Sequence, residues 1–119
     1  MDGEIDAEEL QALLEADDDV RVVDIRSPGA FARGHIPKSV NVPFQELTAR
    51  IEELADTDRV VTVCPHGQAS VQAARLIASY EGFSGRVESL APGIEGWPYD
   101  LVAGDGSADE ADADVDAPF

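Results

Sequence analysis

The chain is poor in the residues and runs that mark secreted and membrane proteins. Its longest uninterrupted apolar run is three residues, whereas a membrane-spanning helix needs about 20. The first twenty residues hold nine acidic side chains and no basic one, the reverse of a signal peptide. The only cysteine, Cys64, has no partner for an internal disulfide, as is typical of a reducing compartment. We therefore expect a cytoplasmic protein without a membrane segment.

Basic residues are also scarce, with 8 Lys and Arg against 25 Asp and Glu and a net charge of −17. Lys38 is the only lysine, and the arginines are scattered along the chain without a cluster. Nucleic acids and anionic lipids are bound through clustered Lys and Arg, so neither is an expected partner. Two interpretations of the acidity stay open, a partner-binding tail and adaptation to a salt-rich cytoplasm. Acid spread over the whole chain favours the halophilic one, because molar salt screens such repulsion.

The length of 119 residues and the hydrophobic content of 44% predict one globular domain. We place this domain at residues 1–103. Residues 104–119 hold six acidic side chains, no basic one and few large apolar groups. Such a segment buries too little surface to offset its ordering entropy, so the sequence predicts a disordered acidic tail. A solvating role is favoured over partner docking.

Strand-like and helix-like patterns alternate along the domain. Short Val-rich runs predict strands at residues 20–25 and 60–63, and two further strands are expected at residues 40–42 and 86–90. Apolar residues at helical spacing predict helices over residues 7–16, 44–54 and 68–80, with helical turns at 28–33 and 93–97. The first helix has Asp6 placed as its N-cap and Glu9 three residues later. The alternation favours an α/β fold, a parallel sheet with helices on both faces.

Cys64 stands where the chemistry of such a fold concentrates. It ends a Val-rich strand and precedes a loop with His66 and Gly67, then a helix beginning near Gln68. Functional loops follow the carboxyl ends of parallel strands, and the amides of a helix N-terminus stabilise a thiolate. Gly67 lets successive amides turn toward an anion, and Ser70 offers a hydroxyl.

Two other interpretations of Cys64 are weaker. A buried structural cysteine acts as a small hydrophobe, but the strand, glycine loop and helix around Cys64 favour a reactive thiol. A zinc site is typically built from about four Cys and His ligands, and this chain has only His66 and His35 beside its single cysteine. We expect no metal.

Three segments together resemble the rhodanese (thiosulfate sulfurtransferase-like) family over about residues 4–99. They are residues 22–43, with Val-Val-Asp-Ile-Arg, Gly-His-Ile-Pro and Val-Asn-Val-Pro; residues 64–70, Cys-Pro-His-Gly-Gln-Ala-Ser; and residues 90–97, which end in Gly-Ile-Glu-Gly-Trp. The second resembles the active-site pattern Cys-x-x-Gly-x-Arg-Ser of that family. The resemblance implies a rhodanese-like sheet of about five parallel strands.

The resemblance further implies that Cys64 is the catalytic nucleophile and carries sulfur as a persulfide, without a cofactor. A cradle for the anion would come from His66, Gly67, Gln68, Ala69 and Ser70. The sulfur donor would be thiosulfate or a persulfide. The acceptor would be cyanide or a thiol, either a thioredoxin-like protein or a low-molecular-weight thiol.

Ala69 departs from the family pattern, which has Arg at this position. An Arg would bring a fixed charge and a fork of donors to an anionic donor. We therefore expect weak capture of thiosulfate, with partial help from His66 when it is protonated.

The first of the three segments contributes supporting residues. Arg26 either faces the Cys64 loop or pairs with a structural carboxylate, and the second role is favoured. His35 is expected to fix a turn by a hydrogen bond, and Asp24 to anchor loop amides at a strand end.

Three other functions compete with sulfur transfer. A phosphatase or arsenate reductase needs Arg six residues after the cysteine. This chain has Ser70 at that position, and its next Arg is Arg75, so this function is disfavoured. A non-catalytic rhodanese-like interaction module and a redox-sensing thiol protein both stay open, because a thiolate that carries sulfur also oxidises readily.

Overall fold

The computed structural model describes residues 2–16 and 19–104. Five strands are present, β1 (Asp2–Ile5), β2 (Arg21–Asp24), β3 (Val40–Asn41), β4 (Arg59–Val63) and β5 (Arg86–Leu90). The α-helices are α1 (Ala7–Glu15), α2 (Pro28–Arg33), α3 (Leu47–Arg50) and α4 (Ala69–Ser79). Three 3-10 helices complete the described residues, η1 (Phe44–Glu46), η2 (Ile51–Leu54) and η3 (Ile94–Gly96). The predicted acidic tail lies outside the described residues except for Gly104.

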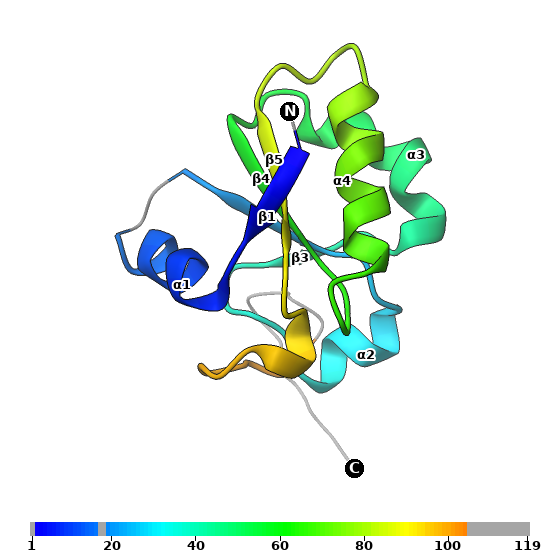
Figure 1. The fold of residues 1–119 in the computed structure, drawn as a ribbon. Helices are drawn as coiled ribbons and strands as arrows, with labels where there is room; N and C mark the ends of the chain where they lie inside the picture. The colour runs from blue at the N-terminus through cyan, green and yellow to red at the C-terminus, as the bar shows by residue number, and fades with distance from the viewer. Residues whose placement is uncertain (1, 17–18, 105–119) are drawn as a thin grey trace.

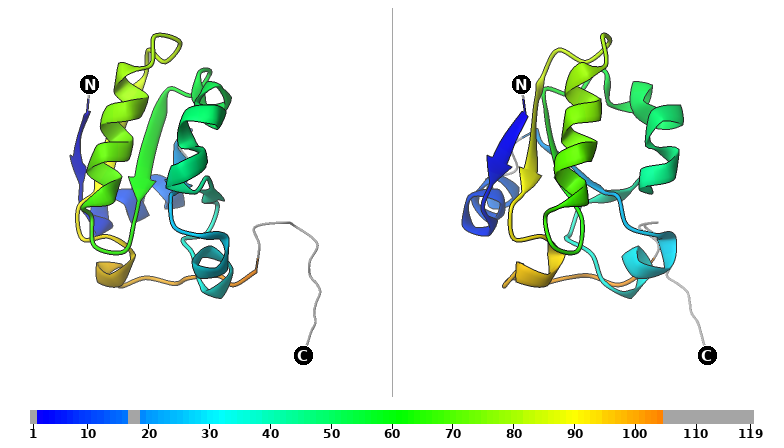
Figure 2. Two further views of the ribbon diagram at one scale, coloured as in Figure 1. Left: turned by 90° about the vertical axis from the view of Figure 1, so that its right-hand side faces the viewer. Right: turned by 45° about the vertical axis from the view of Figure 1, so that its right-hand side comes forward.

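The strands form a single sheet in the order β1-β5-β4-β2-β3, and every pair is parallel (Figure 1). Figure 2 shows α3 and α4 on one face of this sheet and α1 on the other. The predicted α/β architecture, a five-stranded parallel sheet covered on both faces, is confirmed. Because all strands run in the same direction, the loops after β2, β3, β4 and β5 gather at the carboxyl ends of the strands, together with α2 and η3 (Figure 2).

Strand β1 is an element that the sequence pattern did not predict. Its four residues read Asp-Gly-Glu-Ile, and only Ile5 is both apolar and buried. The strand forms one edge of the sheet by pairing with β5, where Ile5 lies opposite Leu90. A short, charged edge strand is common, because charge and shortness protect an exposed edge from further pairing. Such a strand has no alternating pattern to detect.

Two helices differ from their predicted forms. The single helix predicted over residues 44–54 is divided into η1, α3 and η2. Arg50, the last residue of α3, has φ −112 and ψ 7, outside the helical region, so the helix tightens into a 3-10 turn there. The apolar spacing was nonetheless informative, because Leu47 and Leu54 are buried. Helix α4 runs over Ala69–Ser79, one residue shorter at each end than predicted, with Gln68 as its N-cap residue.

The helix predicted to start at Asp6 is confirmed together with its cap. The backbone N–H of Glu9 donates to Asp6 Oδ1 at 2.7 Å, which satisfies one of the free amides of the first turn. Helix α1 ends at Glu15, one residue before the predicted end.

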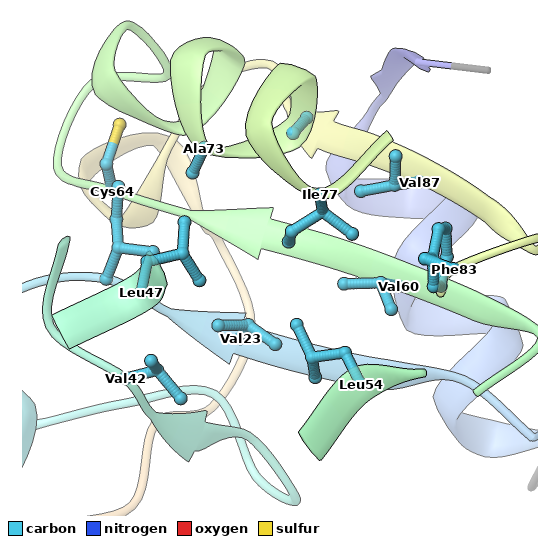
Figure 3. Close-up of a cluster of buried hydrophobic side chains, with 12 residues drawn as sticks. Val23, Val42, Leu47, Leu54, Val60, Cys64, Ala73, Ile77, Phe83 and Val87 are labelled. Atoms are coloured by element: carbon cyan, nitrogen blue, oxygen red, sulfur yellow. The ribbon is translucent and has the colours of Figure 1, made fainter. Parts of the chain in front are cut away.

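The sheet separates two apolar clusters. The larger one lies between the sheet and helices α3 and α4, and Cys64 belongs to it (Figure 3). The smaller one lies under α1 and includes Ile5, Leu10 and Trp97. Alternate residues of β4 face opposite clusters, with Val60 in the first and Val61 and Val63 in the second. This alternation fixes the side of the sheet on which Cys64 emerges.

Candidate active site

Cys64 directly follows β4 and points toward the first turn of α4 (Figure 3). It is only 2% exposed. Strand β4 continues the two-residue alternation, so Cys64 lies on the same face as Val60 and Thr62. The central strand of the sheet therefore holds the thiol rigidly, and the loop after it closes around the sulfur.

In the described part of the chain, two backbone amides donate to the sulfur atom and one hydroxyl lies against it. The backbone N–H of Gly67 lies 3.0 Å from Sγ and that of Ser70 lies 3.3 Å away. The Oγ atom of Ser70 lies 3.3 Å from Sγ. Of the five predicted cradle residues, Gly67 and Ser70 are buried against the sulfur, while His66, Gln68 and Ala69 are exposed.

These groups, together with the neighbouring His66 amide, shift the pKa of the thiol. Burial of Cys64 raises its pKa, but the Ser70 hydroxyl and the backbone amides of Ser70, His66 and Gly67 lower it by more. The net result is a pKa below the ordinary value of 9.0. No charged side chain is among the causes, so the anion is stabilised by neutral dipoles alone.

The loop around Cys64 is locked to the loop that follows β5. The backbone N–H of Ile94 donates to the Cys64 carbonyl at 2.8 Å, and that of Glu95 donates to the Pro65 carbonyl at 3.0 Å. Both carbonyls are thus turned away from the sulfur and toward the neighbouring loop. The conformation that presents the loop amides to Sγ depends on these two bonds.

Two glycines allow this close approach. Gly67 has φ +83, and a Cβ atom there would lie 2.1 Å from the Ala91 carbonyl oxygen. Gly93 has φ +71, and its Cβ would lie 2.4 Å from the Pro65 carbonyl oxygen. Both positions require glycine for backbone conformation and for space. A role in the site for Gly93 and for the amides of Ile94 and Glu95 was not predicted from the sequence, although the Pro-Gly pair at residues 92–93 is a turn signal.

Behind the cysteine lies a buried group of hydroxyls that the sequence analysis missed apart from Ser70. Ser89 Oγ on β5 lies 2.6 Å from Ser70 Oγ. Thr62 Oγ1 donates to the Ser70 carbonyl at 2.7 Å. All three side chains are fully buried. Their signal was present as polar residues at positions of β4 and β5 that share a face with core valines.

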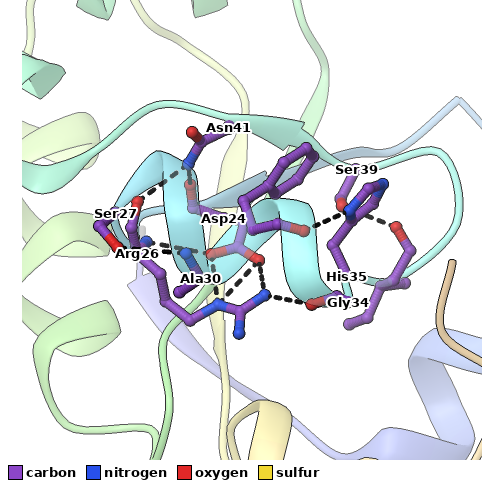
Figure 4. Close-up of polar contacts among 10 residues, drawn as sticks. Asp24, Arg26, Ser27, Ala30, Gly34, His35, Ser39 and Asn41 are labelled. Atoms are coloured by element: carbon purple, nitrogen blue, oxygen red, sulfur yellow. Dashed lines mark hydrogen bonds and ion pairs between the residues drawn. The ribbon is translucent and has the colours of Figure 1, made fainter. Parts of the chain in front are cut away.

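Asp24 and Arg26 form a structural clamp beside the site (Figure 4). The Arg26 guanidinium donates to both carboxylate oxygens of Asp24 at 2.7 to 3.1 Å and to the Gly34 carbonyl at 2.7 Å. The Arg26 backbone N–H also donates to Asp24 Oδ1, at 3.0 Å. Asn41 then donates through its side chain to the carbonyls of Asp24 and Arg26. The clamp ties the loop after β2 to α2 and β3.

His35 is buried and holds the end of α2 (Figure 4). Its Nδ1 lies 2.7 Å from the Phe31 carbonyl oxygen, and its ring stacks on Phe31 with centroids 3.7 Å apart. A carbonyl only accepts, so the hydrogen of the ring is on Nδ1. The backbone of His35 also exchanges two hydrogen bonds of 2.8 Å with Val102. This residue therefore orders the turn and the segment after η3.

Residues 2–16 and 19–104 contain neither a metal-binding group of side chains nor a membrane-spanning helix. No group of three or more His, Cys, Asp or Glu side chains in these ranges is arranged to hold a metal ion. No helix among them is long and apolar enough to cross a membrane.

Comparison with known proteins identifies the class. The family model of the rhodanese-like domain matches residues 6–99. The chain therefore belongs to the rhodanese-like family, and its α/β architecture is the rhodanese fold.

The relatives are sulfurtransferases. The sulfurtransferase of Allochromatium vinosum is 37% identical over 97 residues, which cover 82% of this chain and 89% of that protein. The thiosulfate sulfurtransferase GlpE of Pseudomonas syringae is 39% identical over 105 residues, which cover 84% of this chain and 94% of that protein. The chain is thus a homologue of sulfurtransferases, one of which is a thiosulfate sulfurtransferase.

Some relatives are longer than this chain. The thiosulfate sulfurtransferase structure from Pseudomonas aeruginosa matches with a TM-score of 0.77 and 30% identity, over 86% of this chain but 20% of that one. The chain also spans 50% of YrkF of Bacillus subtilis, with 30% identity over 94 residues. The rhodanese-like domain therefore occurs both alone and as part of larger proteins.

Proposed function

We propose that the chain is a sulfurtransferase or sulfur carrier in which Cys64 takes up a sulfane sulfur as a persulfide. The observation that carries the proposal is the convergence of the Gly67 amide, the Ser70 amide and the Ser70 hydroxyl on one buried sulfur atom. These donors favour the thiolate, which is the nucleophilic form of cysteine.

The reaction has two balanced steps. The Cys64 thiolate attacks the outer sulfur of thiosulfate, an S–S bond forms, and sulfite leaves with the electron pair of the broken S–S bond. Cyanide or a thiolate then attacks the outer sulfur of the Cys64 persulfide, so that thiocyanate or a new persulfide leaves and the Cys64 thiolate returns. No external oxidant or metal is needed in either step.

The loop has further donors for the outer sulfur. The backbone amides of Gln68 and Ala69 donate no hydrogen bond to any residue in the described part of the chain. They belong to the same turn as the amides of Gly67 and Ser70, which already serve Sγ. We assign them to the terminal sulfur of the persulfide, one bond further out than Sγ.

The natural donor is a carrier of low charge in this proposal. The loop from residue 64 to residue 70 has no Arg or Lys, and the nearby guanidinium of Arg26 is paired with Asp24. A dianion such as thiosulfate gains little from neutral donors alone, whereas the reacting end of a small-molecule or protein persulfide carries at most one negative charge. Its acceptor would be a thiol, either a thioredoxin-like protein or a low-molecular-weight thiol, in a reducing compartment such as the cytoplasm.

The proposal is tested by intact mass measurement after exposure to a donor. The wild type is incubated in molar KCl with thiosulfate, and in parallel with glutathione persulfide, then treated with cyanide. We expect a gain of one sulfur atom that cyanide removes and that Cys64→Ser does not show. Loading by the persulfide alone identifies a sulfur relay.

The two competing functions give different masses. Failure of every donor to load a protein shown to be folded by circular dichroism would favour a non-catalytic interaction module. A gain of one oxygen after mild peroxide, trapped by dimedone, without any loading of sulfur would favour a redox-sensing thiol.

A further inference from the structure

The buried hydroxyls of Ser70 and Ser89 form a row of polar atoms with the sulfur of Cys64. Ser70 Oγ lies 3.3 Å from the cysteine sulfur on one side and 2.6 Å from Ser89 Oγ on the other. Ser70 and Ser89 are each 0% exposed. Ser89 comes from β5 and Ser70 from the first turn of α4, so the row of three atoms crosses from the sheet to the helix that carries the site.

The hydrogens in this row can be placed by accounting for acceptors. Within residues 2–16 and 19–104, Ser70 Oγ is the only side-chain or backbone partner of Ser89 Oγ. A buried hydroxyl hydrogen without an acceptor costs about 1–3 kcal/mol. Ser89 avoids that cost when it donates to Ser70. The hydrogen of Ser70 is then directed at the sulfur.

This arrangement suits an anionic sulfur better than a protonated one. With the thiolate, every hydrogen in the row has an acceptor, from Ser89 to Ser70 to Sγ. With the thiol, three hydrogens share two contacts, so one of them has no acceptor in the row. It is the S–H hydrogen, the Ser89 hydrogen when the row reverses, or the Ser70 hydrogen when Ser70 Oγ accepts from both neighbours. The dipole of the Ser89 hydroxyl also points its positive end along the row toward the sulfur.

We infer that Ser89 is a positioning residue, which acts through Ser70 to hold Cys64 in the nucleophilic thiolate form. Ser89 does not touch the sulfur, and its effect reaches Cys64 only through the Ser70 hydroxyl. The inference deepens the proposed function, on which its significance for sulfur transfer rests. The ionisation itself can be measured with no sulfur donor present.

Other titratable groups near the sulfur do not account for the same effect. The elements packed around Cys64 in its cluster contribute apolar side chains, including Val42, Leu47 and Ala73. His66 and Glu95 on the adjoining loops are exposed, and Arg26 is paired with Asp24. Burial is the largest influence on the pKa of Cys64, and it raises the pKa. Among the influences that lower this pKa, the Ser70 hydroxyl is the largest.

The test is the pH dependence of Cys64 alkylation by iodoacetamide in wild type, Ser89→Ala, Ser70→Ala and the double variant. Iodoacetamide is neutral and reacts with the thiolate, so its rate reports the thiolate fraction. We expect Ser89→Ala to move the profile to higher pH and to lower the alkylation rate at neutral pH about two- to fourfold. The reason is that the hydrogen bond from Ser70 to the thiolate is no longer strengthened by the hydrogen bond that Ser70 accepts from Ser89. Ser70→Ala removes that bond, and about tenfold or more is expected.

The double variant separates positioning from a general disturbance. If Ser89 acts through Ser70, Ser89→Ala adds no further shift in the Ser70→Ala background. The matched control is Ser79→Ala, which removes an exposed hydroxyl from the far end of α4 and should leave the profile unchanged. An unshifted profile for Ser89→Ala would overturn the inference, and so would an equal shift in both backgrounds.

A second pair of variants covers the case in which Ser89→Ala does not fold. Ser89→Thr and Ser89→Val have nearly equal volume and differ in the hydroxyl. The inference requires a higher pKa of Cys64 in the Val variant than in the Thr variant, and equal values would refute it. Persulfide loading of the wild type is measured separately, so absence of sulfur transfer would refute the proposed function and leave the role of Ser89 intact.

Discussion

Gly67→Ala tests whether the locked pair of loops sets the reactivity of Cys64. A Cβ atom at residue 67 would lie 2.1 Å from the Ala91 carbonyl oxygen and 3.2 Å from that of Leu90. The obstacle is backbone, which cannot rotate away as a flexible side chain does. The φ of +83 at residue 67 adds strain of about 1–2 kcal/mol for any residue with a Cβ.

The magnitude follows from the distance that the loop must move. Ordinary contact requires a shift of roughly 1 Å or more, which carries the Gly67 amide out of the 3.0 Å hydrogen bond to Sγ. A hydrogen bond to a charged group contributes about 1.5–3 kcal/mol. Its loss raises the pKa of Cys64, because the thiolate loses a donor. We expect the alkylation rate at neutral pH to fall about ten- to hundredfold, and the free energy of unfolding to fall by about 1–2 kcal/mol from φ strain alone.

The assay is iodoacetamide alkylation across pH, with urea unfolding on the same samples. The control is Gly29→Ala in α2, where the new Cβ meets only the end of the Arg33 side chain at 3.8 Å. That change should leave Cys64 reactivity unaltered and raise stability by about 0.5–1 kcal/mol. If Gly67→Ala kept the alkylation profile of the wild type, the amide at residue 67 would not control the thiolate and the reasoning would fail.

The remaining predictions concern charge, strain and pH. Ala69→Arg should increase the rate of thiosulfate loading, measured by thiocyanate release, and an unchanged rate would argue against a missing cation as the cause of weak capture. Lys38→Gly should raise the free energy of unfolding by about 1 kcal/mol in urea titrations, because Lys38 has φ 73; no gain would show that its side chain compensates. The fold should be more stable in molar than in dilute KCl, and equal urea midpoints would contradict halophilic adaptation. The pKa of Cys64 in the folded protein lies below its ordinary value of 9.0, so the thiolate contributes its full stabilisation above pH 9.0. This contribution is lost as pH falls through the folded pKa. The free energy of unfolding of the wild type should therefore fall relative to that of Cys64→Ser until the difference between the two becomes constant at lower pH.

Much of the fold was predictable because hydrophobic pattern and buried position coincide. The Val-rich runs that became β2 and β4 lie inside the sheet, where both faces are covered and apolar residues dominate. Strand β1 escaped prediction because an edge strand gains its place from pairing with β5, which leaves little trace in four residues. The division of residues 44–54 into three short helices likewise depends on backbone packing and not on apolar spacing.

The site was predictable only along the chain and not across it. The glycine loop and the helix after Cys64 are contiguous in sequence, so the donors at Gly67 and Ser70 were accessible to sequence reasoning. Ser89 and Gly93 are about 25 to 30 residues away and reach the site through the pairing of β4 with β5. A serine on a strand and a glycine in a turn are too common to indicate that role without the structure.

The chemistry of Cys64 has to operate inside a chain whose net charge is −17. Two electrostatic effects of different range act on an incoming anionic donor. The hydrogen bonds at 3.0 to 3.3 Å act at contact with a buried sulfur atom, so salt screens them little. The repulsion by the acidic surface acts over the screening length, which falls from about 10 Å at 0.1 M salt to about 3 Å at 1 M. Salt should therefore speed the approach of thiosulfate strongly while it changes the pKa of the buried thiol little, which separates the contribution of the surface from that of the cradle.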